Sequence, residues 1–94
     1  MKVLLTNYFK RAGKKLHRNQ VVTLEKAIQE IQNNPMIGEP KVGDLAGIRV
    51  YKLRILHQLI LLAYTYDEQD DEIVLLHFAS HKNFYDTLKK QDKG

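Results

Sequence analysis

The feature that most constrains the fold is a change of hydrophobic periodicity at one Pro- and Gly-rich segment, residues 33–43, here called the joint. Before the joint, apolar residues recur every three or four positions, as they do on a helix with one buried face. Residues 8–16 and 21–31 both follow this spacing. The sequence therefore predicts two amphipathic helices with a break near residues 17–20, and a short strand over residues 2–5 fits the pattern before them.

Beyond the joint the pattern is typical of strands. Residues 48–54, 59–64 and 73–79 are rich in β-branched, aromatic and other apolar residues. Because strands usually span about 5 to 6 residues, the stretch 48–66 needs a reversal, which we place near Leu56 and His57. The acidic residues 67–72 are expected to close a second hairpin, and Ser80 can cap a short C-terminal helix.

These elements give the order β-α-α-β-β-β-α and predict one α+β domain over residues 1–94. In this arrangement the helix pair packs on one face of an antiparallel sheet and leaves the other face partly open. The absence of cysteine excludes a disulfide framework and a thiolate metal site, and it fits a reducing cytoplasm. The apolar runs are shorter than a signal-peptide core or a membrane span requires. We therefore expect a cytoplasmic protein that does not enter a membrane.

The formal net charge of +4 is distributed unevenly along the chain. Acidic residues are absent from the first twenty positions and crowd residues 67–72. A basic face indicates a polyanion or an acidic protein as partner, whereas the alternative is an ordinary solvated helix face followed by an acidic turn. Charge alone does not choose between them. The early cations are Lys2, Lys10, Arg11, Lys14, Lys15 and Arg18.

Four segments in this order are similar to toxins of the RelE/ParE superfamily: residues 27–35, residues 41–52, an apolar strand ending in Ala63 and Tyr64, and residues 79–85. The resemblance covers nearly the whole chain and has the element order predicted from periodicity. It implies the toxin of a bacterial type II toxin–antitoxin system that is held silent by a cognate antitoxin protein. Its target would be the ribosome with its messenger RNA, as for RelE-like members, or DNA gyrase, as for ParE-like members.

The nuclease activity implied by the resemblance uses the ribose 2′-OH as nucleophile and needs neither metal nor cofactor. Such chemistry requires proton transfer, which suits histidine because its unperturbed pKa is about 6.5. His81 and Tyr85, at the start of the final helix, and Arg49 are the expected catalytic residues; the alternative for His81 is a surface histidine at a helix start. The expected RNA-binding residues are Tyr51, Lys52, Arg54 and Lys82.

Side chains two apart in a strand share a face. Arg49 and Tyr51 should therefore lie on one face of their strand, and Lys52 and Arg54 on the other. We place Arg49 and Tyr51 on the open face of the sheet. The competing interpretation is that these cations only protect an edge strand from pairing with another chain.

The remaining histidines point to structural roles. His77 alternates with Ile73 and Leu75 and is expected to be a hydrogen-bonded residue of the core or its rim. His57 is interpreted as a turn residue and His17 as a loop residue. The histidine spacings match no zinc signature, so no metal is expected.

One departure from the family pattern bears on function. Some RelE-type nucleases place an arginine in the middle strand, where this chain has Gln58, and a neutral amide cannot stabilise a phosphate as a guanidinium does. Three functions stay open. The favoured one is a ribosome-dependent mRNA endonuclease centred on His81, and the others are a gyrase poison without catalytic residues and an inactive toxin-like binding protein.

Overall fold

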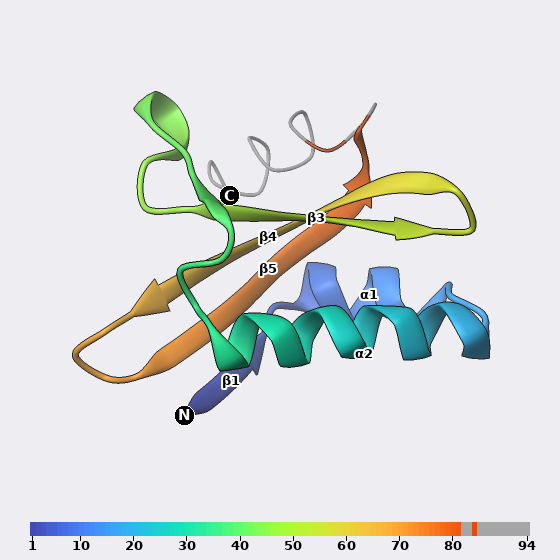
Figure 1. Cartoon of the computed structure of the whole chain (residues 1–94), viewed down its shortest axis with the longest axis horizontal. Helices are drawn as coiled ribbons and strands as arrows, with labels where there is room; N and C mark the ends of the chain where they lie inside the picture. Colours follow the sequence, from blue (N-terminus) through green and yellow to red (C-terminus); the bar gives the residue numbers. More distant parts are fainter. Residues whose placement is uncertain (82–83, 85–94) are drawn as a thin grey trace.

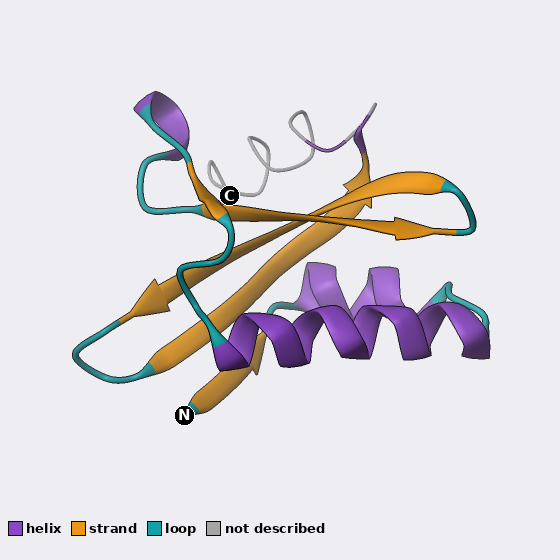
Figure 2. Ribbon diagram, viewed as in Figure 1, coloured by secondary structure: helices purple, strands orange, loops and turns teal. Residues whose placement is uncertain are grey.

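The computed structural model describes residues 1–81 and residue 84 and has an α+β architecture (Figures 1 and 2). Two helices lie on one side of a five-stranded sheet. The elements, in chain order, are β1 (Lys2–Leu5), α1 (Asn7–Lys14), α2 (Arg18–Asn33), β2 (Glu39–Pro40), the 3-10 helix η1 (Gly43–Leu45), β3 (Arg49–Ile55), β4 (Gln58–Asp67) and β5 (Glu72–Ser80).

The sheet has the strand order β1-β5-β4-β3-β2. Strands β3, β4 and β5 pair antiparallel in chain order, as predicted, and β2 pairs antiparallel with β3. β1 runs parallel to β5, with Val3 beside Ile73 and Leu5 beside Leu75, a neighbour that the sequence did not predict. The reason is that a strand's own pattern reports its buried face and not its neighbour, which here lies about seventy positions later in the chain.

The helix-side core lies between the two helices and the sheet. Phe9 of α1 and Leu24 and Ile31 of α2 pack against strand residues that include Leu62 and Tyr64, all of them buried. α1 begins after Thr6, whose Oγ1 accepts a hydrogen bond from the N–H of Phe9 at 3.2 Å. The two predicted helices are confirmed, although the break between them covers residues 15–17 and α2 already begins at Arg18.

A second core cluster lies on the opposite face of the sheet, here called the open face. Its buried members include Leu45, Val50, Leu61 and Ala63. Phe84, which comes four residues after the end of β5, is fully buried in the same cluster. The predicted C-terminal helix falls mostly on residues 82–83 and 85–94, which lie outside the described residues. No helix in the described part of the chain is both long and apolar enough to cross a membrane.

The reversal predicted between β3 and β4 is confirmed at Leu56 and His57, which have φ angles of 51° and 67°. Two consecutive positive φ values match the hairpin turns that normally favour Asn-Gly, which explains why the local sequence gives little sign of it. The acidic hairpin between β4 and β5 is also confirmed. The sequence did not predict β2 and η1, which are short and lie within or directly after the joint.

Candidate functional site

The strand register brings Lys52 and Arg54 to the open face of the sheet, and His81 follows the end of β5 on the same side. In β4, Leu61 is the partner of Lys52 and Leu59 is the partner of Arg54. Both leucines pack in the open-face cluster, so the two cations share that side. The exposed side chains of Lys52 and Arg54 therefore stand beside an apolar floor.

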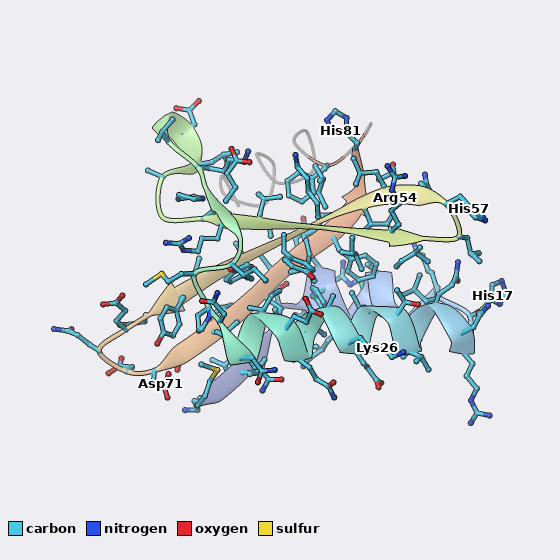
Figure 3. All side chains as sticks on the ribbon, in the orientation of Figure 1. His17, Lys26, Arg54, His57, Asp71 and His81 are labelled. Atoms are coloured by element: carbon cyan, nitrogen blue, oxygen red, sulfur yellow. The ribbon has the colours of Figure 1, made fainter. Side chains whose placement is uncertain are left out.

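His81 joins this group just beyond β5. It directly follows Ser80, the last residue of β5, whose partner in β4 is Ile60. Figure 3 shows both residues on the side of the sheet away from the helices. His81 is exposed, and Arg54 Nη1 donates to the carbonyl oxygen of His57 at 3.4 Å.

The prediction that Arg49 and Tyr51 lie on the open face is wrong. Tyr51 packs against the helix-side core, and its hydroxyl donates to Glu30 Oε2 of α2 at 2.8 Å. This hydrogen bond to a carboxylate raises the pKa of Tyr51. The alternation was correct, but the side was reversed, because Val50, between the two residues, is buried in the open-face cluster with Leu61 and Phe84.

Arg49 contacts the joint instead of the open face. Its Nη1 donates to the carbonyl oxygens of Met36 at 3.1 Å and Gly38 at 2.8 Å. Opposite Arg49 in β4, the buried Tyr64 hydroxyl donates to the Pro35 carbonyl at 2.6 Å and accepts from the Gly38 N–H at 2.9 Å. Burial raises the pKa of Tyr64. These four hydrogen bonds fix the backbone of the joint against the sheet.

Gly38 explains why the joint can approach the sheet so closely. A Cβ at this position would lie 2.7 Å from both Cε1 and Oη of Tyr64, inside any normal contact distance. The sequence analysis placed Tyr64 only at the end of an apolar strand and did not predict this polar role. A glycine in the middle of the joint was the one available sign of it.

His77 is a core histidine, as expected, but with a different environment from the one predicted. Its ring is stacked near Phe78 and lies 6.1 Å from the Tyr8 ring, at a bulge in the pairing of β4 with β5. Burial lowers the pKa of His77. Its buried Nδ1 makes no hydrogen bond within the described residues, so the expected hydrogen bond is not found there.

The other predicted residues are placed as follows. His57 lies in the β3–β4 turn and His17 precedes α2, in agreement with the sequence analysis. Gln58 is exposed and pairs with Ile55, a residue of the helix-side core, so it is not part of the open-face group. Lys82 and Tyr85 lie outside the described residues. Within residues 1–81 and 84, no three His, Asp or Glu side chains gather as a metal site would require.

A groove of about 400 Å³ lies between α1 and α2. Its walls are almost entirely apolar, and Gly13 of α1 forms part of them. A Cβ added to Gly13 would meet nothing within 4 Å, so packing inside the chain does not require glycine there. The other lining residues are Leu5, Phe9, Lys10, Lys14, Val21, Leu24, Glu25 and Ile28.

Comparison with known families identifies the protein class. The family model for the ParE-like toxin of type II bacterial toxin–antitoxin systems matches residues 3–89. The chain belongs to this family. It is therefore a toxin of a type II toxin–antitoxin system within the RelE/ParE superfamily. A search of curated proteins finds no match.

Solved structures confirm that this ParE-like toxin has the RelE fold. A mutant of the E. coli toxin RelE in the free state superposes with a TM-score of 0.74 at 14% identity, covering 98% of this chain and 95% of that chain. The toxin–antitoxin complex RelBE2 from Mycobacterium tuberculosis gives 0.66 at 23% identity, with 85% and 96% covered. The intact E. coli RelBE complex gives 0.68 at 17% identity, with 83% and 93% covered. At such identities the likeness establishes the fold, and the target depends on the site.

Proposed function

We propose that this ParE-like toxin is a ribosome-dependent mRNA endonuclease whose site is the open-face group of Lys52, Arg54 and His81. One observation carries the proposal: the strand register sets two exposed cations beside an apolar floor on one face of the sheet, and an exposed histidine follows the end of β5 on the same side. A sheet fixes the two cations more firmly than a loop would. Such a target would place the toxin in the cytoplasm.

In the proposed reaction the ribose 2′ oxygen attacks the adjacent phosphorus, and the bond from phosphorus to the 5′ oxygen breaks. The upstream fragment keeps a 2′,3′-cyclic phosphate. One proton leaves the 2′-OH and one is delivered to the departing 5′ oxygen, and His81 performs one of these transfers. Lys52 and Arg54 stabilise the added negative charge on the phosphate. The reaction needs no metal or cofactor.

The proposal revises the roles of the remaining candidates. Arg49 and Tyr51 contact the joint and α2, so they support the fold of β3 and are left out of the chemistry. Lys82 and Tyr85 follow His81 closely in sequence and stay candidates for binding phosphate and for donating a proton or stacking on a base.

Primer-extension mapping of translated messages tests this function against the alternatives. The wild-type toxin should cut messages at codons in the ribosomal A site, whereas a gyrase poison should leave transcripts intact and induce the SOS response. His81→Gln should lower the cleavage rate by a factor of about 10² to 10⁴ while ribosome binding persists. His57→Gln, which changes an exposed histidine in the β3–β4 turn, is the matched control and should cleave normally. Cleavage that survives His81→Gln would remove His81 from the mechanism.

We also propose that the α1–α2 groove binds an acidic, amphipathic segment of a cognate antitoxin. The groove offers apolar walls with two cations, Lys10 and Lys14, against one acid, Glu25, so its charged lining is net positive and suits such a segment. A glycine inside a helix costs about 1 kcal/mol relative to Ala, and the open space at Gly13 supports a role in the close approach of a partner backbone. Solved RelE structures that include the antitoxin RelB give the family precedent for this class of partner.

Co-expression tests the antitoxin site, starting from the small open reading frame expected beside the toxin gene. Gly13→Ala should stabilise the isolated toxin, because the helix gains propensity without a clash. Gly13→Leu should fill the groove, leave toxicity intact and reduce neutralisation by the antitoxin. Full neutralisation of Gly13→Leu would show that the antitoxin binds elsewhere.

A further inference from the structure

The two edges of the sheet are built differently. The strand order makes β1 and β2 the edge strands (Figure 1). β2 consists of Glu39 and Pro40, a residue without an N–H, and Glu39 Oε1 lies 3.5 Å from Lys41 Nζ. A short, charged edge that contains proline resists pairing with another strand. β1 contains no proline and no bulge in its pairing, and its one charged residue is Lys2.

The pairing of β1 with β5 fixes which backbone groups of β1 face outward. Lys2 and Thr6 each donate their N–H to a backbone carbonyl on the β5 side, at 3.1 Å. Because N–H and C=O groups alternate between the two sides of a strand, Leu4 also faces β5. The N–H and C=O groups of Val3 and Leu5 therefore point away from β5. Within residues 1–81 and 84, the sheet has no strand on that outer side.

The side chains of β1 add apolar surface on both faces of this edge. Val3 packs against the helix-side core, so alternation places Leu5 on the same side and Leu4 on the open-face side. Leu4 and Leu5 are 42% and 41% exposed. An edge strand that presents outward backbone groups together with exposed leucines is a template for the addition of another strand.

We propose that β1 pairs with β1 of a second copy of this chain, antiparallel, about a two-fold axis at Leu4. In this register Val3 of each copy lies opposite Leu5 of the other. Both pairs use the outward-facing groups, so each pair exchanges two N–H···O=C hydrogen bonds. The two Leu4 residues meet across the axis as a non-hydrogen-bonded pair, whose Cα atoms are about 4.5 Å apart. The two sheets then form one continuous sheet.

Charge complementarity favours a second copy as the occupant of this edge. The acidic residues 67–72 adjoin the start of β1, where Lys2 is the partner of Glu72, and α1 with Lys10 and Arg11 begins just beyond its end. Antiparallel pairing brings the acidic hairpin of each copy toward the basic start of α1 in the other copy, at both ends of the junction. An acidic antitoxin strand on the same edge would meet the like charge of the hairpin.

The proposed pairing leaves the candidate site uncovered. A two-fold axis that relates two antiparallel neighbouring strands is perpendicular to the sheet, so the open faces of both copies lie on the same side. Lys52, Arg54 and His81 of each copy stay accessible on that side. The dimer is therefore independent of the target of the toxin, and it would persist if the proposed nuclease activity were not found.

Sedimentation equilibrium and amide hydrogen exchange followed by NMR test the dimer on the purified chain. The measured mass should double as the protein concentration rises. Exchange of the Val3 and Leu5 amides should slow by at least about tenfold in the dimer, because these amides become hydrogen-bonded. Exchange of the Leu4 amide, which faces β5, should not depend on concentration. A dimer in which Val3 and Leu5 exchange as fast as in the monomer would use another surface and would overturn the proposal.

Leu4→Lys tests the register, because it sets two like charges opposite each other across the axis. It should raise the dissociation constant of the dimer by at least about tenfold. Val22→Lys is the matched control: Val22 is 46% exposed on α2, and its replacement makes the same change in charge. This control should dimerise like the wild type. An equimolar mixture of the Leu4→Lys and Leu4→Glu proteins should dimerise again, which a misfolded variant could not do.

Three results would overturn the pairing of two copies through β1. The first is a monomer at every concentration, and the second is an equal dissociation constant for Leu4→Lys and Val22→Lys. The third is protection of the Val3 and Leu5 amides that appears only when the antitoxin encoded beside the toxin gene is added. That result would assign the edge to an antitoxin strand.

Discussion

The Tyr64 hydroxyl offers a sharp test of how the joint is held, because Tyr64→Phe keeps the buried ring and removes only the polar contact. The hydroxyl donates to the Pro35 carbonyl at 2.6 Å and accepts from the buried Gly38 N–H at 2.9 Å. Each hydrogen bond contributes about 1 kcal/mol net, and a buried group left without a partner costs about 1 to 3 kcal/mol. The substitution should therefore lower the free energy of unfolding by about 2 to 3 kcal/mol. For a chain of this size that corresponds to a fall in Tm of roughly 8 to 24 °C.

Urea unfolding followed by far-UV circular dichroism measures this loss. Tyr66→Phe is the matched control, because Tyr66 lies two residues further along β4 and its hydroxyl donates to the exposed Asp71 at 3.2 Å. That change should leave the urea midpoint almost unmoved. If both variants shift the midpoint equally, the buried hydroxyl does not hold the joint and the reasoning is refuted. A change in the slope of the transition, rather than in its midpoint, would point to an altered unfolded state.

Three further predictions address the core, a buried histidine and the β3–β4 turn. Leu61→Ala should cost about 2 to 5 kcal/mol in urea unfolding and abolish all activity, since Leu61 is 1% exposed; a smaller loss would mean that the open-face cluster collapses around the cavity. Burial lowers the pKa of His77 below 6.5, so its unfolded form binds protons first and stability should fall as pH drops below about 6.5. His77→Leu should flatten that part of the pH profile, and an unchanged profile would assign it to other groups. Replacing Leu56 and His57 by Asn and Gly should raise stability by about 1 kcal/mol, because both positions have positive φ and a non-glycine residue there costs roughly 1 to 2 kcal/mol; a lower Tm would contradict this.

The open-face group also shows why the sequence could name site residues without assembling them. His81, Lys52 and Arg54 were identified from residue type and family resemblance. Their meeting depends on the pairing of Arg54 with Leu59 and of Ile60 with Ser80, which no local pattern encodes. The same pairing excludes Gln58, which lies on the helix side and so does not occupy a place in this group.

The elements themselves were determined locally. Helical spacing before the joint and apolar runs after it predicted α1, α2, β3, β4 and β5, because a segment's own periodicity reports which of its faces is buried. Length alone required the reversal at Leu56 and His57, since a nineteen-residue strand would be far longer than strands of about 5 to 6 residues.

Tertiary structure decided which pair of β3 side chains would face the helices and which would lie on the open face. Alternation correctly placed Arg49 with Tyr51 and Lys52 with Arg54, but it could not say which pair would face the helices. That choice follows from contacts between distant segments. Val50 packs in one cluster with Phe84 on the open face, whereas Tyr51 donates to Glu30 of α2 and Arg49 donates to carbonyls of the joint. The parallel pairing of β1 with β5 was settled in the same way. A period of two residues fixes which side chains are neighbours, and only packing against the rest of the chain fixes where they point.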